Sequence, residues 1–186
     1  MKRALFLLSL TLFLTFPGTG TLPTEELASI FEQPFLLTSA GQNADVQMAA
    51  VLAKRAGLAY TLAKLAAPKD LENVKTLALV VGVSLKGLGA AGLDMEKEKA
   101  RLSALITAAQ KANISILCLH LGGEARRGVQ TDELVSEILP LAKMAIVVKS
   151  GNADGIFTKI CQAKDIPLIE VEKTADALTP LKNVFK

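Results

Sequence analysis

The sequence has 186 residues, of which 51% are hydrophobic and 4% aromatic, and it carries a formal net charge of +3. This length suits one domain with one aliphatic core, and the nearly balanced charge argues against the clustered basic surface that binds nucleic acid. The one histidine and two distant cysteines lack a compact ligand spacing, so no metal site is expected.

The first 20 residues have the pattern of an export signal. Lys2 and Arg3 precede an apolar run over residues 4–16, which is shorter than the roughly 20 residues of a membrane helix. We therefore expect a signal peptide over residues 1–20, cleaved after Gly20, and a protein exported to the periplasm or the extracellular space. Membrane contact would occur only through this segment before cleavage; an uncleaved anchor is the alternative. Cleavage lowers the lysines and arginines from 21 to 19, against 18 acidic residues, so the mature chain is nearly neutral.

A polar lead over residues 21–33 precedes a single domain over residues 34–186. Residues 35–38 predict a buried strand, and small polar residues lead from it into a helix that ends at Gly57. Strand and helix signals then alternate to the end of the chain. Further strands are expected at residues 58–62, 76–83, 114–120, 145–148 and 167–171, and further helices begin near residues 94, 131, 153 and 174.

This alternation predicts an α/β fold with a single doubly wound, mostly parallel sheet of five or six strands. Such a flavodoxin-like or Rossmann-like domain carries helices on both faces. If residues 58–62 form an edge strand, the order 2-1-3-4-5-6 places the first and third strands side by side. Ligands of such sheets bind beyond the carboxyl ends of the strands at this switch point. We therefore expect a crevice where the loops at Ser39 and Ser84 meet.

Charged and sulfur-containing side chains within these elements have simple structural interpretations. The helix after Asp94 is expected to carry a solvated outer face, with ion pairs between residues three apart. This face comprises Glu96, Lys97, Glu98, Lys99 and Arg101. Cys118 and Cys161 fall in apolar surroundings and are expected to be core residues, with a disulfide as the less favoured alternative.

The loop after the first strand is the first candidate for ligand contact. Asn43 and Asp45 are explained as caps of the following helix. A similar series at residues 150–154 lies between a later strand and helix, where Asn152 is either a cap or a further ligand contact. The residues of the first loop that capping leaves unexplained are Ser39, Gly41 and Gln42.

The loop over residues 84–92 contains a GxGxxG string, which is typical of dinucleotide-binding folds. Here the string follows the third strand rather than the first, so it is a weak indication of a dinucleotide. Lys86 could hold a carboxylate or phosphate or be solvated, and Ser84 and Gly87 lie beside it in the sequence. With one tyrosine and no tryptophan, the loops lack rings to stack on a flavin, and the cofactor is unknown.

The loop after the fourth strand is the richest in ionisable groups. Arg126 and Arg127 could clamp an anion, pair with Glu124 or be solvated. His120 could serve as a base for Ser39, although the residues around Ser39 lack the first glycine of a nucleophile elbow. The glycines of this loop, which would let a ligand approach the backbone, are Gly122 and Gly123.

Four segments together carry a resemblance to a known family. They are LLTSAGQ (36–42), KGLGAAG (86–92), HLGGEARRG (120–128) and GNADGIFTK (151–159). In this combination the chain resembles an uncharacterised family of small exported bacterial proteins, a domain of unknown function, over nearly the whole mature chain. The resemblance implies an exported α/β domain with its signature residues in loops, and it implies no activity.

The favoured hypothesis is an exported single-domain module that binds a small polar or anionic ligand at the switch point. The first loop would supply hydrogen bonds, and the charge would come from Lys86, His120, Arg126 and Arg127, oriented by Glu124. Two alternatives remain open. One is a periplasmic enzyme, in particular a hydrolase with His120 as general base, and the other is a protein-interaction module of a membrane or transport complex.

Overall fold

The structure is a computed structural model that describes residues 30–186. The expected signal peptide and residues 21–29 of the lead lie outside the described residues. Six parallel strands form one sheet in the order β2-β1-β3-β4-β5-β6, which confirms the predicted doubly wound fold and strand order. The strands are β1 (Phe35–Ala40), β2 (Tyr60–Leu62), β3 (Thr76–Val81), β4 (Ser115–His120), β5 (Met144–Val148) and β6 (Leu168–Val171).

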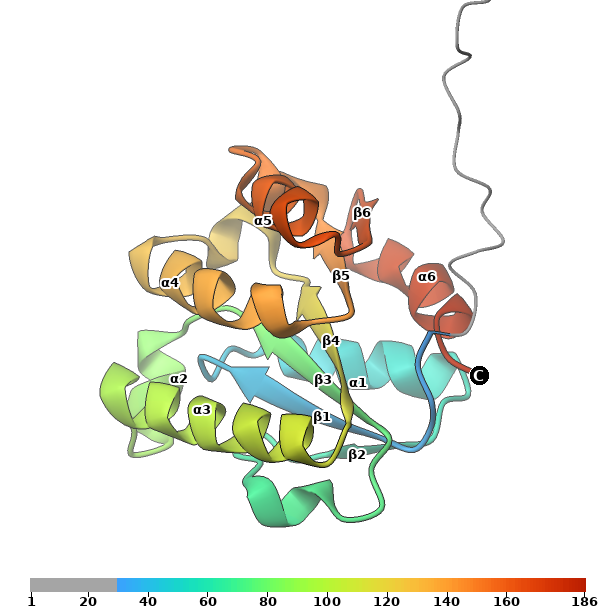
Figure 1. Ribbon diagram of the computed structural model, residues 1–186. Coiled ribbons are helices and arrows are strands. Elements are labelled where there is room, and N and C mark those ends of the chain that lie inside the picture. Colours follow the sequence, from blue (N-terminus) through green and yellow to red (C-terminus); the bar gives the residue numbers. More distant parts are fainter. Residues whose placement is uncertain (1–29) are drawn as a thin grey trace, which may run out of the picture.

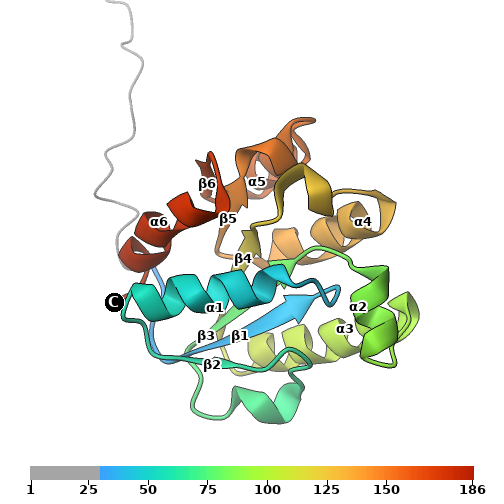
Figure 2. The same ribbon diagram turned by 180° about the vertical axis from the view of Figure 1, so that it is seen from behind.

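Helices cover both faces of this sheet, as Figures 1 and 2 show from opposite sides. One face packs against α1 (Asp45–Arg55) and α6 (Leu178–Asn183), and the other packs against α3 (Met95–Lys111), α4 (Val129–Ile138) and α5 (Ile156–Lys164). The short helix α2 (Leu85–Ala90) follows β3. Single turns of 3-10 helix are η1 (Pro68–Leu71), η2 (Gly123–Arg126), η3 (Leu139–Leu141), η4 (Lys149–Asn152) and η5 (Thr174–Ala177).

The two helical layers explain why the central strands are apolar throughout. In β3, Leu77 and Leu79 pack on the side of α3, whereas Ala78 and Val80 pack on the side of α1. A strand with both faces covered has no position for a polar side chain that needs water. Within residues 30–186, no helix is long and apolar enough to cross a membrane.

Both ends of the described chain lie at the amino edge of the sheet, where the strands begin. Phe31 is fully buried and its ring lies 5.6 Å from that of Phe185, measured between centroids. Its main chain pairs with the same residue. Phe31, which the sequence pattern places in the lead, therefore packs against the last residues of the chain.

The two cysteines are buried and free, which confirms their interpretation as core residues. Burial raises the pKa of the Cys118 thiol to about 12 and that of Cys161 to about 11. Both thiols therefore stay protonated near neutral pH, and a protonated thiol is a poor nucleophile.

Candidate functional site

The loops after β1 and β3 meet at the carboxyl edge of the sheet, as the strand order predicts. Gln42 and Val83 form an isolated β-bridge, and the main-chain N–H of Ser84 donates to the carbonyl of Gly41 over 2.8 Å. A Cβ on Gly41 would clash with the carbonyl of Gly82, and one on Gly87 would clash with the carbonyl of Gln42. These glycines thus allow the two loops to approach each other directly, where we expected a crevice.

Ser39 and Asn43 tie the β1–α1 turn to the neighbouring strand. The Ser39 hydroxyl is buried and accepts the main-chain N–H of Asn43 over 3.0 Å. The Asn43 amide donates to the carbonyls of Val80 and Gly82 over 3.0 and 2.7 Å, and its Oδ1 accepts the N–H of Asp45 over 3.0 Å. Asn43 therefore accepts the first N–H of α1. The N-cap is Ala44, which makes no side-chain bond, and the expected capping by Asp45 is wrong because its carboxylate pairs with Arg126. The Ser39 hydroxyl bonds within the protein.

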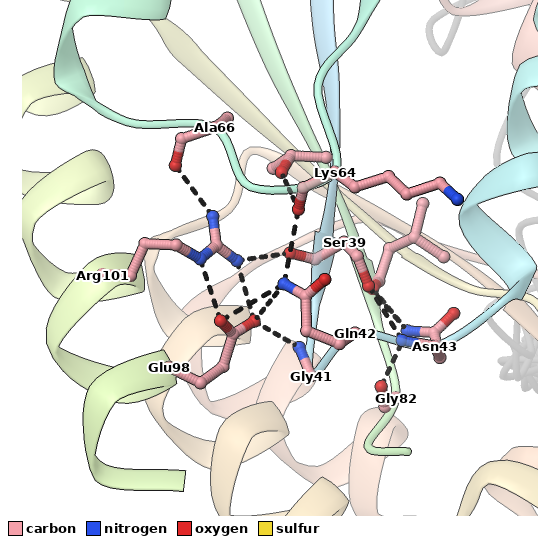
Figure 3. A network of polar contacts seen from close by, with 11 residues as sticks. Ser39, Gly41, Gln42, Asn43, Lys64, Ala66, Gly82, Glu98 and Arg101 are labelled. Atoms are coloured by element: carbon pink, nitrogen blue, oxygen red, sulfur yellow. Dashed lines mark hydrogen bonds and ion pairs between the residues drawn. The ribbon is translucent and has the colours of Figure 1, made fainter. Parts of the chain in front are cut away.

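A buried ion pair from α3 holds the other side of this turn (Figure 3). The Glu98 carboxylate is fully buried and accepts from the Gly41 N–H over 2.8 Å and from the Gln42 amide over 3.1 Å. Arg101 donates to both carboxylate oxygens over 2.8 and 2.9 Å. Its remaining donors reach the carbonyls of Ser39 and Ala66 over 2.6 and 2.8 Å.

The expected solvated face of α3 is therefore wrong for Glu98 and Arg101. Of the expected pairs three residues apart, that of Glu98 with Arg101 is confirmed. That of Glu96 with Lys99 is wrong, because Lys99 pairs with Glu133 and Glu137 of α4. A sequence signal for Glu98 exists, because it lies four residues before Leu102 and so belongs to the buried stripe of the helix.

The GxGxxG string forms the short helix α2 and the turn after it, without an open glycine loop. The Ser84 hydroxyl caps this helix by accepting the N–H of Gly87 over 3.1 Å. Lys86 is exposed, and its ammonium group makes no hydrogen bond or ion pair within residues 30–186. Of the three candidates in this loop, Lys86 alone presents an unused polar side chain to solvent.

His120 is fully buried at the end of β4. Its Nδ1 lies 2.9 Å from the carbonyl of Val81, and its Nε2 lies 3.1 Å from the carbonyl of Gly123. Burial lowers the pKa of His120, against the two carbonyl contacts that raise it; the field of Arg127 also lowers it. A general base must reach the proton that it removes. Since both ring nitrogens face main-chain oxygens, this arrangement does not favour the proposed role of His120 as general base.

Arg127 bonds to the protein through all of its nitrogens. Its Nε donates to Asp132 over 2.7 Å, and its two Nη atoms donate to both oxygens of Asp154 over 3.0 and 2.9 Å. Nη1 also contacts the carbonyl of Gly151. These carboxylates raise the pKa of Arg127, and the guanidinium in turn lowers the pKa of Asp154. Of the alternatives left open for this arginine, solvation and pairing with Glu124 are therefore wrong, because its partners are Asp132 and Asp154.

Arg126 has a different environment from its neighbour. Its Nε donates to Asp45 over 3.0 Å, and 33% of its side chain is exposed. Within residues 30–186, its Nη atoms donate no hydrogen bond to the protein. A Cβ on Gly122 would clash with both members of this ion pair. Gly122 thus makes room for the pair between Arg126 and Asp45.

The remaining candidates belong to the contact between the loops after β4 and β5. Asn152 is buried; its Oδ1 accepts the N–H of Phe157 over 2.9 Å, and its amide donates to Thr158 and Glu170 over 2.7 and 2.9 Å.

Gly123 has φ +58° and lies against Ser150. Glu124 is exposed, and only its main-chain N–H contacts Ser150, over 3.4 Å.

The structure thus brings all the sequence-predicted residues to one sheet edge, but most of them bond to one another. Among the charged side chains, those with unused hydrogen-bonding groups at the surface are Lys86, Glu124 and Arg126. Within the described part of the chain, no group of three His, Cys, Asp or Glu side chains is placed to hold a metal ion.

The fold and this edge define an α/β protein with a doubly wound parallel sheet. Residues 32–185 match the family described as "Domain of unknown function (DUF6305)", and the chain belongs to this family. This membership confirms the resemblance to an uncharacterised family. No curated protein matches the sequence significantly.

Two solved structures are similar in fold. A GDSL-like lipase from Bacteroides thetaiotaomicron is 10% identical, with a TM-score of 0.35 over 80% of this chain and 70% of the lipase. AlinE4, an SGNH-hydrolase family esterase, is 12% identical, with a TM-score of 0.29 over 81% of this chain and 79% of the esterase. At these values the likeness concerns the α/β fold class alone.

Proposed function

We propose that this domain is an exported binding module that holds a small anionic ligand at the carboxyl edge of its sheet, with Arg126 as the main contact. The observation that carries this proposal is the difference between two consecutive arginines. Arg127 uses every nitrogen within the protein, whereas Arg126 uses only Nε and exposes one third of its side chain.

The ion pair with Asp45 prepares Arg126 for a ligand. Asp45 accepts from Nε over 3.0 Å and so fixes the plane of the guanidinium before any ligand arrives. Gly122 provides the space in which this pair forms. A side chain that is already held in its binding orientation loses less entropy when it binds, which favours affinity.

The chemistry of the free Nη atoms indicates the class of ligand. Two parallel N–H groups of a guanidinium match the two oxygens of a carboxylate or phosphate. Lys86 follows β3 at the same edge and adds a second positive charge that no described carboxylate neutralises. A small organic acid with one carboxylate on Arg126 is the ligand class that fits these groups.

Calorimetric titration with a panel of di- and tricarboxylates tests this function. We expect one panel member to bind the wild-type protein, and Arg126→Gln to weaken its affinity about tenfold or more, because a charged hydrogen-bond pair is lost. Arg126→Lys keeps the charge but removes the two parallel N–H groups of the guanidinium, so its affinity should lie between those of Arg126→Gln and the wild-type protein.

Arg55→Gln is the matched control, since Arg55 is an exposed arginine at the end of α1 whose loss changes the net charge equally. It should bind like wild type. Absence of any binding acid, or equal affinities for the variants at 126 and 55, would overturn the proposal.

Export is a separate part of the same proposal. It is supported by the basic start, apolar run and small residues of the first 20 positions. Mass spectrometry of the protein recovered from a bacterial periplasm should give a chain that begins at Thr21. Recovery of the intact chain from the cytoplasm would contradict export.

A further inference from the structure

The amino edge of the sheet, opposite the edge with the loops described above, contains a hollow of about 350 Å³. Segments that precede three adjacent strands line it. Lys75 precedes β3, Ser115 begins β4, and Lys143 precedes β5. Because β3, β4 and β5 are neighbours in the sheet, the main-chain positions of the two lysines flank that of the serine across roughly 10 Å, which is two strand spacings.

The charge in this hollow is mainly positive. Lys75 and Lys143 are exposed, and neither ammonium group makes an ion pair or hydrogen bond within residues 30–186. Glu32 is the one carboxylate among the lining residues, and it pairs with Lys186 over 2.9 Å. Within the described residues, neither lysine therefore makes an ion pair, and Glu32 is the one carboxylate that lines the hollow with them.

The state of Glu32 indicates that these charges converge. Its pKa is lowered, chiefly by Lys186 and further by the fields of Lys75 and Lys143. Both lysines thus act on the same point at the mouth of the hollow. A group with negative charge that entered the hollow would meet the same field.

We propose that this hollow, the amino-edge site, binds a phosphate group between Lys75 and Lys143, with the Ser115 hydroxyl as a neutral donor. Three donors that approach from three adjacent strands suit a tetrahedral oxyanion better than a planar carboxylate. Lysine also binds phosphate as a point charge, without the planar geometry that a guanidinium imposes.

Two sources could supply this phosphate group. Ile30, the first described residue, lines the hollow, so the chain that precedes it departs from here. If residues 4–16 stay in a membrane, the phosphate headgroup of a lipid is one source. If they are removed, the site is open to soluble phosphate compounds. The same side chains serve in both cases.

Amide NMR with inorganic phosphate and pyrophosphate tests the soluble source, and flotation of the full chain with vesicles tests the lipid source. We expect the amides of Ser115 and Asn113 to shift on saturation with phosphate, or phosphatidylglycerol vesicles to retain more protein than phosphatidylcholine vesicles. Lys75→Gln combined with Lys143→Gln should weaken either effect about tenfold, since two charge-assisted contacts are lost.

The matched control combines Lys64→Gln with Lys69→Gln, which removes the same charge from two exposed lysines outside the hollow. It should bind like wild type. If neither phosphate nor anionic vesicles bind, or if the two double variants behave alike, the amino-edge site does not exist.

Discussion

The turns between β1 and α1 and between β5 and α5 have similar sequences but different connections. Each contains a buried asparagine and an aspartate that binds one of two consecutive arginines. Asn43 donates to main-chain carbonyls of the neighbouring strand and its following loop, whereas Asn152 caps its own helix and donates to side chains. The similar sequences reflect a similar connection from strand to helix. Which polar groups remain free for a ligand depends on the hydrogen-bond partners of each turn.

The arginines extend this comparison. In the β5–α5 turn, both oxygens of Asp154 accept hydrogen bonds from Arg127. In the β1–α1 turn, Asp45 accepts from Nε of Arg126 alone. The β1–α1 turn has a second support that the other turn lacks, the buried pair of Glu98 and Arg101. A rigid turn beside a partly used guanidinium is the combination that favours the β1–α1 side as the binding side.

Removal of the charge on Glu98 should have the largest effect on this comparison. Glu98→Gln leaves Arg101 partly buried without its carboxylate, and we expect a loss of about 3 kcal/mol in the free energy of unfolding. Urea denaturation measures this loss. Glu96→Gln is the matched control, because Glu96 is an exposed carboxylate in the same first helical turn, and it should lose less than about 0.5 kcal/mol. Equal losses would show that the turn does not depend on the ion pair.

Substitution of Arg127 should lower the free energy of unfolding more than substitution of Arg126, whereas substitution of Arg126 should weaken ligand binding more. Arg127→Gln breaks contacts to Asp132, Asp154 and a main-chain carbonyl, so we expect a loss of about 2 kcal/mol. Arg126→Gln breaks one partly exposed pair and should lose less than about 1 kcal/mol. Paired urea titrations of the two variants provide the measurement, and a larger loss at position 126 would remove the distinction between the turns.

Much of the fold follows from local sequence signals. The apolar run of β3 is long enough for a strand buried on both faces, and alternation of strands with helices implies parallel pairing. The full strand order then follows if the short second strand is placed at the edge of the sheet. These features depend on residues close in sequence, so the pattern alone could predict them.

The candidate site could be located but not resolved from the sequence. Gln42 contacts Glu98 across 56 positions, and Arg126 contacts Asp45 across 81 positions. Whether a polar side chain faces a ligand or another loop depends on such distant partners, which a local pattern does not identify. The position of Glu98 on the buried stripe of α3 was the one available signal, and its charge favoured the wrong interpretation.

His120 lies between the two turns and should give the smallest effect, a pH dependence of stability. In the folded protein its pKa is lowered, mainly by burial, so the unfolded chain binds more protons below its usual pKa of about 6.5. The unfolding free energy should therefore be nearly constant above that pH and fall below it, by at most about 1.4 kcal/mol at pH 5.5. Urea midpoints between pH 5.5 and 8 measure this change.

The control is His120→Gln, which removes the titrating group at the cost of some stability at every pH. Because His120 is the one histidine of the chain, and carboxylates titrate mostly below this range, the variant should show a flat profile. Because the two ring nitrogens of His120 face the carbonyls of Val81 at the end of β3 and Gly123 in η2, the fall in stability would report on the imidazole held between them. A wild-type profile as flat as that of the variant would mean that the two carbonyls offset burial and keep the pKa of His120 at its ordinary value.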